Sequence, residues 1–213
     1  MERIKAKIVS FFKYYRKQFF FYLALNIVFV LTITLSSYVN IPLSGFKDRL
    51  LYFIHIILLQ FSITGYIYLF TLNKWLFRIV FVPVFLILSM FSYWVFTQDI
   101  SITQSLIAAV IESKPSIFID LVSYQYLLYI LIIIFLIVII NRFYKKIAPV
   151  KINLFFIIVS MISIYSFNLI ENYRANTLKS RLPYNFFLGF KNYLEKDNYI
   201  FSKITDEVYS RSE

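Results

Sequence analysis

The feature that most constrains this chain is a series of five long stretches without a charged side chain. They contain between 19 and 29 residues each and run over Gln18–Phe46, Leu50–Asn73, Ile79–Gln98, Leu121–Asn141 and Ile152–Ile170. An α-helix rises about 1.5 Å per residue, so roughly 20 residues cross a hydrocarbon core about 30 Å thick. The chain is 60% hydrophobic and only 15% charged, which is too little charge to cover the surface of an ordinary soluble domain. We therefore predict an all-α integral membrane protein.

The spans are predicted to be helices although their composition would favour strands in water. Residues Ile130–Ile140, for example, read ILIIIFLIVII. In lipid a lone strand leaves its backbone N–H and C=O groups unpaired, whereas a helix satisfies them internally. The stretches also lack the polar–apolar alternation of a membrane β-barrel. The expected spans are five helices at about residues 19–38, 50–72, 79–96, 124–140 and 152–170.

The net charge of +11 predicts an orientation and does not indicate a nucleic-acid surface. The N-terminal segment and the second and fourth connections together hold twelve Lys and Arg residues and one acid, Glu2, while the opposite side holds ten bases and ten acids. All of the excess cation therefore lies on one side, as the positive-inside rule requires of the cytoplasmic face. We expect a cytoplasmic basic segment over residues 1–18 and a C-terminus on the outer side.

Few residues of this sequence could carry chemistry by themselves. The chain has no cysteine and a single histidine, His55, which falls inside the second predicted span. An intramembrane ionisable group is a functional candidate, although a neutral histidine also serves simply to bond a neighbouring helix. We find no metal-ligand spacing, no nucleophile motif and no phosphate-binding glycine loop. On residues alone, a structural or lipid-contacting membrane domain is favoured over a self-contained enzyme.

The outer segment between the third and fourth spans, residues 97–123, is the natural place for a site. Three of its polar side chains are the acids Asp99, Glu112 and Asp120, and two short amphipathic runs are broken by Pro115. The spacing of the acids across a proline fixes no paired-carboxylate geometry.

The tail over residues 171–213 is predicted to contain a second outer element. Pro183 suits the first turn of a helix, and aromatic and aliphatic residues then recur at helical spacing. They are Phe186, Phe187, Phe190, Tyr193 and Leu194. A helix with such a face would lie in the plane of the membrane interface.

Short motifs in these two segments resemble the N-terminal membrane domain of bacterial phosphoethanolamine transferases, the family that includes lipid A-modifying and colistin-resistance enzymes. The sequence Glu112-Ser113-Lys114-Pro115 followed by Asp120-Leu121 resembles the motif of the family's outer segment. The preceding run Asp99–Thr103 and the tail run Arg181–Asn185 resemble its flanking and bridging segments. The resemblance covers the layout of essentially all 213 residues.

The resemblance implies a membrane-anchoring and lipid-presenting role. Phosphoethanolamine would pass from phosphatidylethanolamine to lipid A or another surface glycan, in the bacterial inner membrane. Substrate-binding candidates are Glu112, Ser113, Asp99 and Asp120, and no catalytic or metal-binding residue is expected in this chain. No cofactor is expected here either, because zinc and the nucleophile would belong to a C-terminal periplasmic catalytic domain following Glu213.

Two positions depart from the family pattern. Ala109 stands where the family has a substrate-contacting Asn, and Ile117 stands where a second acid is expected. These departures point to a different acceptor or substrate pose. The alternative that the residues leave open is a small non-enzymatic multi-pass membrane protein acting as an assembly partner or subunit.

Overall fold

A computed structural model describes residues 2–39, 45–112, 122–147, 154–173 and 179–195, and this part of the chain is all-helical, without a strand. Its elements, in chain order, are α1 (Glu2–Phe29), the π-helical turn η1 (Val30–Thr34), the short 3₁₀ turn η2 (Leu35–Ser37), α2 (Gly45–Leu72), the π-helical turn η3 (Leu76–Phe81), α3 (Val82–Gln98), α4 (Gln104–Glu112), α6 (Tyr124–Lys146) and α7 (Leu154–Tyr173). A further helix, here the tail helix, covers residues 184–195.

The prediction of an all-α membrane protein is confirmed. Within the described residues, four continuous helical segments are long and apolar enough to cross a membrane: Arg16–Ser37, Gly45–Leu72, Leu76–Gln98 and Tyr124–Lys146. They coincide with the first four predicted spans and extend them by a few residues. The fifth predicted span is helix α7, whose described apolar stretch is Ile157–Phe167. The fifth crossing therefore stays a prediction.

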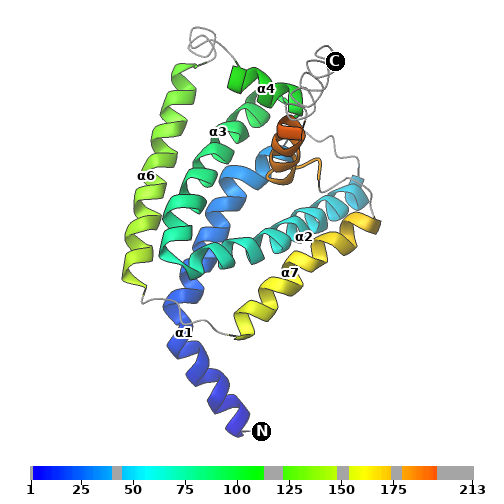
Figure 1. Ribbon diagram of the computed structural model, residues 1–213. Coiled ribbons are helices and arrows are strands. Elements are labelled where there is room, and N and C mark those ends of the chain that lie inside the picture. The colour runs from blue at the N-terminus through cyan, green and yellow to red at the C-terminus, as the bar shows by residue number, and fades with distance from the viewer. Residues whose placement is uncertain (1, 40–44, 113–121, 148–153, 174–178, 196–213) are drawn as a thin grey trace, which may run out of the picture.

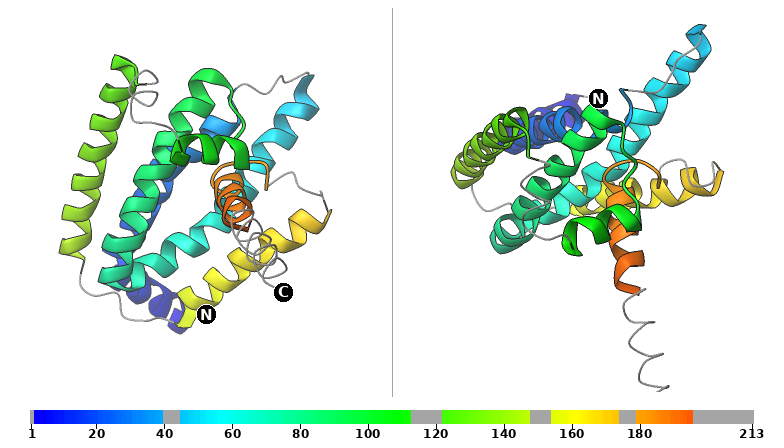
Figure 2. Two further views of the ribbon diagram at one scale, coloured as in Figure 1. Left: turned by 45° about the horizontal axis from the view of Figure 1, so that its top comes forward. Right: turned by 90° about the horizontal axis from the view of Figure 1, so that it is seen from above.

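The helices form two groups that differ in direction (Figure 1). Helices α3 and α6 run side by side with α1 behind them, whereas α2 and α7 lie against each other and are inclined to that group. Helix α4 and the tail helix gather at the end of the bundle away from the N-terminus, as the two further views in Figure 2 also show. The basic segment from Glu2 onward continues α1 as one helix.

The first and third spans each contain a π-helical turn, η1 and η3, and the sequence explains the second of these. Pro83 lies in the first turn of α3, directly after η3, where its missing N–H and bulky ring prevent a regular α-helical bond to the preceding turn. In the first span, η1 leaves the carbonyl oxygen of Thr32 available to neighbours. It accepts hydrogen bonds from the Ser92 hydroxyl (2.5 Å) and the Tyr129 hydroxyl (3.2 Å), which tie three spans together.

The α2–α7 contact depends on a glycine. A Cβ placed on Gly65 would lie 2.7 Å from the backbone oxygen of Ser160 and 3.0 Å from a side-chain carbon of Ile164. The Ser163 hydroxyl donates to the backbone oxygen of Phe61 at the same crossing. Small residues commonly allow such close approach between membrane helices, because lipid supplies no hydrophobic force to drive them together.

Aromatic side chains fill the core at the end of the bundle near residue 77. Phe77 and Tyr144 stack with ring centroids 4.1 Å apart, and the Tyr144 hydroxyl donates to the backbone oxygen of Thr71 (2.8 Å). Along α6 only Tyr126, Ile133 and Ile140 are buried. These three residues are seven apart and form the buried stripe of α6, and beside it lie the partly buried side chains of Tyr129, Ile130, Leu136, Ile137 and Tyr144.

Candidate functional site

Helix α4 belongs to the segment between the third and fourth spans, residues 97–123. Its start is fixed by Thr103, whose hydroxyl accepts from the Leu106 N–H (3.4 Å) while its carbonyl accepts from the Ile107 N–H (3.1 Å). The side chain of Ile107 is fully buried and holds the short helix against the bundle. Nine residues would be marginal as an isolated helix, so this packing is what stabilises it.

The predicted site residues with a described position are Asp99 and Glu112. Asp99 follows the last turn of α3 in the left-handed backbone region (φ 52°), a conformation that Asp tolerates better than most residues, and it is exposed. Glu112 is the last described residue of α4 and its side chain is exposed as well. Ser113 and Asp120 lie outside the described residues.

The tail helix packs onto the first turn of α4. A Cβ on Gly189 would lie 2.9 Å from the Cδ1 atom of Ile107 and about 3.4–3.5 Å from the backbone of Thr103 and Gln104. Glycine thus permits the backbone of the tail helix to approach α4 closely. Residues some eighty positions apart in the sequence are thereby brought together at one end of the bundle.

The start of the tail helix is anchored to the end of the first span. Leu182 is completely buried, and its N–H donates to the Ser37 hydroxyl (3.1 Å). The Arg181 guanidinium donates to the Ser37 carbonyl (2.8 Å) and lies 5.3 Å from the centre of the Tyr38 ring. In the described part of the chain no carboxylate forms an ion pair with Arg181. Among the described residues, its charge faces the carbonyl dipole of Ser37 and the ring of Tyr38.

Tyr184 joins the tail helix to the inclined pair of spans. Its ring stacks on Phe167 of α7 with centroids 4.1 Å apart, and its hydroxyl is 3.0 Å from the Ser62 hydroxyl of α2. Burial raises the pKa of this phenol above its usual range, so the hydroxyl stays protonated. Beside it lies an apolar cavity of about 350 Å³, lined by residues of α1, α2, η3, α3 and the tail, Pro183 and Phe187 among them.

The aromatic face predicted for the tail helix is divided between two environments. Phe186 and Tyr193 are half-buried, and Phe186 packs 5.0 Å from the Phe91 ring of α3. Phe187, Phe190 and Leu194 remain between 39% and 47% exposed. The helix therefore uses one side against the protein and leaves another free for lipid, instead of lying wholly on the membrane surface.

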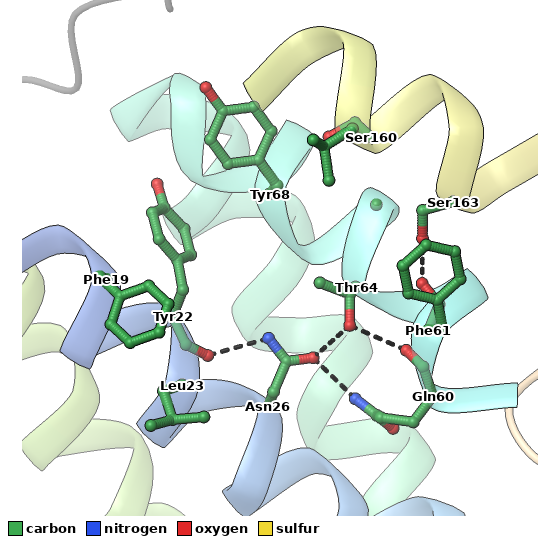
Figure 3. A pocket seen from close by; sticks show the side chains of 12 residues that line it. Phe19, Tyr22, Leu23, Asn26, Gln60, Phe61, Thr64, Tyr68, Ser160 and Ser163 are labelled. Carbon is green, nitrogen blue, oxygen red and sulfur yellow. Dashed lines mark hydrogen bonds between the residues drawn. The ribbon is translucent and has the colours of Figure 1, made fainter. Parts of the chain in front are cut away.

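A polar cluster lies inside the membrane-spanning part, between α1 and α2 (Figure 3). The Asn26 side-chain oxygen accepts from the Gln60 amide and from the Thr64 hydroxyl, each at 2.8 Å, and the Asn26 amide donates to the Tyr22 carbonyl (2.8 Å). The Thr34 hydroxyl adds a bond to the Gln60 oxygen (3.0 Å). The cluster borders an apolar cavity of about 310 Å³ between α1, α2 and α7. Because its members bond one another, it is best explained as a helix–helix contact.

His55 also bonds a neighbouring helical segment. Its Nδ1 lies 2.6 Å from the Tyr38 hydroxyl, and the Tyr52 hydroxyl donates to the Tyr38 carbonyl (2.5 Å). Both contacts meet at the residue whose ring also contacts Arg181. His55 thus contacts the residue on which the anchor of the tail rests, and such a contact is what a histidine that bonds a neighbouring segment would make.

From the sequence, Asn26 had no predicted role, and Arg181 was part of a motif without a role of its own. A signal for Asn26 existed, because an amide in an apolar span needs a hydrogen-bond partner, but the partner Gln60 lies 34 residues away. Among the described residues no group of three or more His, Asp and Glu side chains could hold a metal ion.

Comparison with known proteins gives no further assignment. No protein-family model matches the chain, and no significant match was found among curated proteins or solved structures.

Proposed function

We propose that this chain is the membrane-anchoring, lipid-presenting part of a phosphoethanolamine transferase, oriented with its N-terminus in the cytoplasm and with α4 and the tail helix on the outer side. The observation that carries the proposal is the contact of Gly189 with Ile107. The two segments on which the resemblance depends, far apart in the sequence, lie against each other at one end of the bundle (Figure 1).

The chemistry at this end suits a zwitterionic phospholipid. Phosphatidylethanolamine carries a phosphate and an ammonium group, and this end offers the guanidinium of Arg181 and the exposed carboxylate of Glu112. The apolar cavity beside Tyr184 lies next to the same elements and is lined by hydrocarbon and rings, which suits an acyl chain. Holding donor and acceptor lipids at one surface would lower the entropic cost of bringing them together.

The test is mass spectrometry of lipid A and other surface glycans from cells with the intact gene, without it, and with Glu112→Gln. We expect phosphoethanolamine on a surface glycan only with the intact gene, and a several-fold lower amount with Glu112→Gln. The matched control is Glu195→Gln on the tail helix, because Glu195 is an exposed carboxylate whose one ion pair among the described residues is the i,i+4 pair with Lys191. This variant should retain the modification.

Identical glycans with and without the gene would refute the transferase assignment and favour the non-enzymatic assembly partner. Orientation is tested separately. The chain has no cysteine, so a single cysteine at Ser113 should react with a membrane-impermeant reagent added from outside. Protection of that cysteine until the membrane is opened would overturn the orientation and the proposal together.

A further inference from the structure

A second lipid-compatible surface lies at the opposite end of the bundle from α4. A groove of about 650 Å³ runs between α1 and α6, with Arg16, Lys17 and Lys146 at one end and apolar side chains such as Ala24 and Ile139 along the rest. We propose that this groove binds an anionic phospholipid of the base-rich leaflet, with its phosphate on the three cations and an acyl chain between the two helices.

The length of the groove matches one leaflet. From Arg16 to Val28, the first and last α1 residues that line it, the helix rises roughly 18 Å, and half of a hydrocarbon core is about 15 Å thick. The charged residues are all at the end nearest the N-terminus of α1 and the C-terminus of α6. The polarity therefore changes along the groove in the same order as along a phospholipid, from headgroup to chain.

The cations are available to an anion. Arg16 lies 5.8 Å from the centre of the Phe20 ring, and the Lys146 ammonium lies 5.9 Å from the centre of the Phe143 ring; both rings line the groove. These contacts hold the charged groups over the groove without neutralising them. Within the described residues no carboxylate pairs with Arg16, Lys17 or Lys146.

The distribution of acids strengthens this argument. Four acidic residues have described side chains, and all of them belong to the other end of the helices: Asp48 in the first turn of α2, Asp99 after α3, Glu112 in α4 and Glu195 in the tail helix. Basic pockets between spans on a cytoplasmic face are typical sites for anionic headgroups, and each base near the surface contributes about 1 kcal/mol, or roughly a fivefold preference.

The experiment compares two adjacent positions on α6. Ile139 lines the groove, whereas Val138 is 44% exposed on another face of the same helix at nearly the same depth. Single cysteines at Ile139 and Val138, labelled with a fluorophore, are reconstituted in phosphatidylcholine nanodiscs. Part of that lipid is replaced by brominated phosphatidylglycerol or by brominated phosphatidylcholine. We expect the anionic lipid to quench the probe at residue 139 at least about fivefold more effectively, with little preference at residue 138.

Charge variants identify the headgroup site. Replacing Arg16, Lys17 and Lys146 by Gln should remove the preference at residue 139. The control replaces Lys74, Arg142 and Lys145 by Gln. These are exposed bases on the same side but outside the groove, so the net charge falls by the same amount and the lipid preference at residue 139 should remain. In the labelled single-cysteine protein without charge replacements, raising the salt concentration to about 1 M should also abolish the preference, because the Debye length falls to about 3 Å.

Two results would overturn the proposal. Equal lipid preference at residues 138 and 139 would show a diffuse attraction to the whole basic surface. Loss of preference in the control triple variant to the same extent as in the groove variant would show that no particular set of bases holds the lipid. The test does not involve the outer end of the protein, so it is independent of the transferase assignment.

Discussion

Substitution of Gly65 by Ala tests the closest helix contact of the fold. The added Cβ would lie 2.7 Å from the Ser160 backbone oxygen, and a backbone atom cannot move away without shifting α7 as a whole. Overpacking of this kind costs typically 1–3 kcal/mol, while replacing a mid-helix glycine by alanine returns about 0.5–1 kcal/mol. The net loss in the free energy of unfolding is then between about 0 and 2.5 kcal/mol, and we expect about 1 kcal/mol, measured by equilibrium denaturation in mixed detergent micelles.

The matched control is Gly189→Ala in the tail helix. Its Cβ meets the Cδ1 atom of Ile107 at 2.9 Å, which is the flexible end of a side chain that can adopt another rotamer, and the nearest backbone atom is 3.4 Å away. The gain of about 0.5–1 kcal/mol for a mid-helix glycine is then offset by about 0.5–1.5 kcal/mol for a displaced Ile107 rotamer, so this variant should unfold within about 0.5 kcal/mol of the unmutated protein. A Gly65→Ala protein as stable as the Gly189→Ala protein would refute the inference that α2 and α7 cross at this distance.

Three further substitutions test other contacts by the same unfolding measurement. Asn26→Leu removes the acceptor that Gln60 and Thr64 share, and it should lower the free energy of unfolding by about 1–2 kcal/mol because both donors lose a partner inside the membrane-spanning part. An unchanged stability would contradict these two hydrogen bonds. Leu182→Ala, at a fully buried position, should lower the free energy of unfolding by about 2–4 kcal/mol and make the tail helix sensitive to protease. A tail helix that stays protected from protease would contradict its anchoring through Leu182. Tyr144→Phe keeps the ring stack and removes one hydrogen bond, so it should lower the free energy of unfolding by about 0.5–1.5 kcal/mol. A larger loss would show that the hydroxyl has another role.

The sequence predicted the helices well because the bilayer restricts the choice. Uncharged length sets where a span can lie, and the capping Ser123 and the basic residues at the end of α6 mark its limits in ordinary ways. Contacts between spans were not predictable, because an apolar helix presents similar surfaces on all sides. Gly65 was visible as a small residue in the second span, but nothing in the sequence identifies Ser160 as its neighbour.

The candidate site was predicted less completely than the spans. The sequence predicted Glu112, Asp99 and the tail to be outer elements, which stays a prediction, and the resemblance alone suggested that they act together. The close packing of Gly189 on Ile107 depends on three-dimensional distances, as does the meeting of Arg181 with Ser37 and Tyr38. The sequence shows which polar side chains within the spans need a hydrogen-bond partner, but it does not show which partner each one takes.

The buried stripe of α6 affects how the bundle responds to the thickness of the bilayer. A straight helix turns about 20° per heptad away from a strict seven-residue repeat, so a stripe made of Tyr126, Ile133 and Ile140 requires α6 to lean slightly across its neighbours. Ring stacking with Trp94 near one end and with Phe77 near the other fixes both ends of that lean. A change in bilayer thickness that tilts α6 would therefore have to shift these ring stacks, and the width of the space between α6 and α1 would follow the lipid composition.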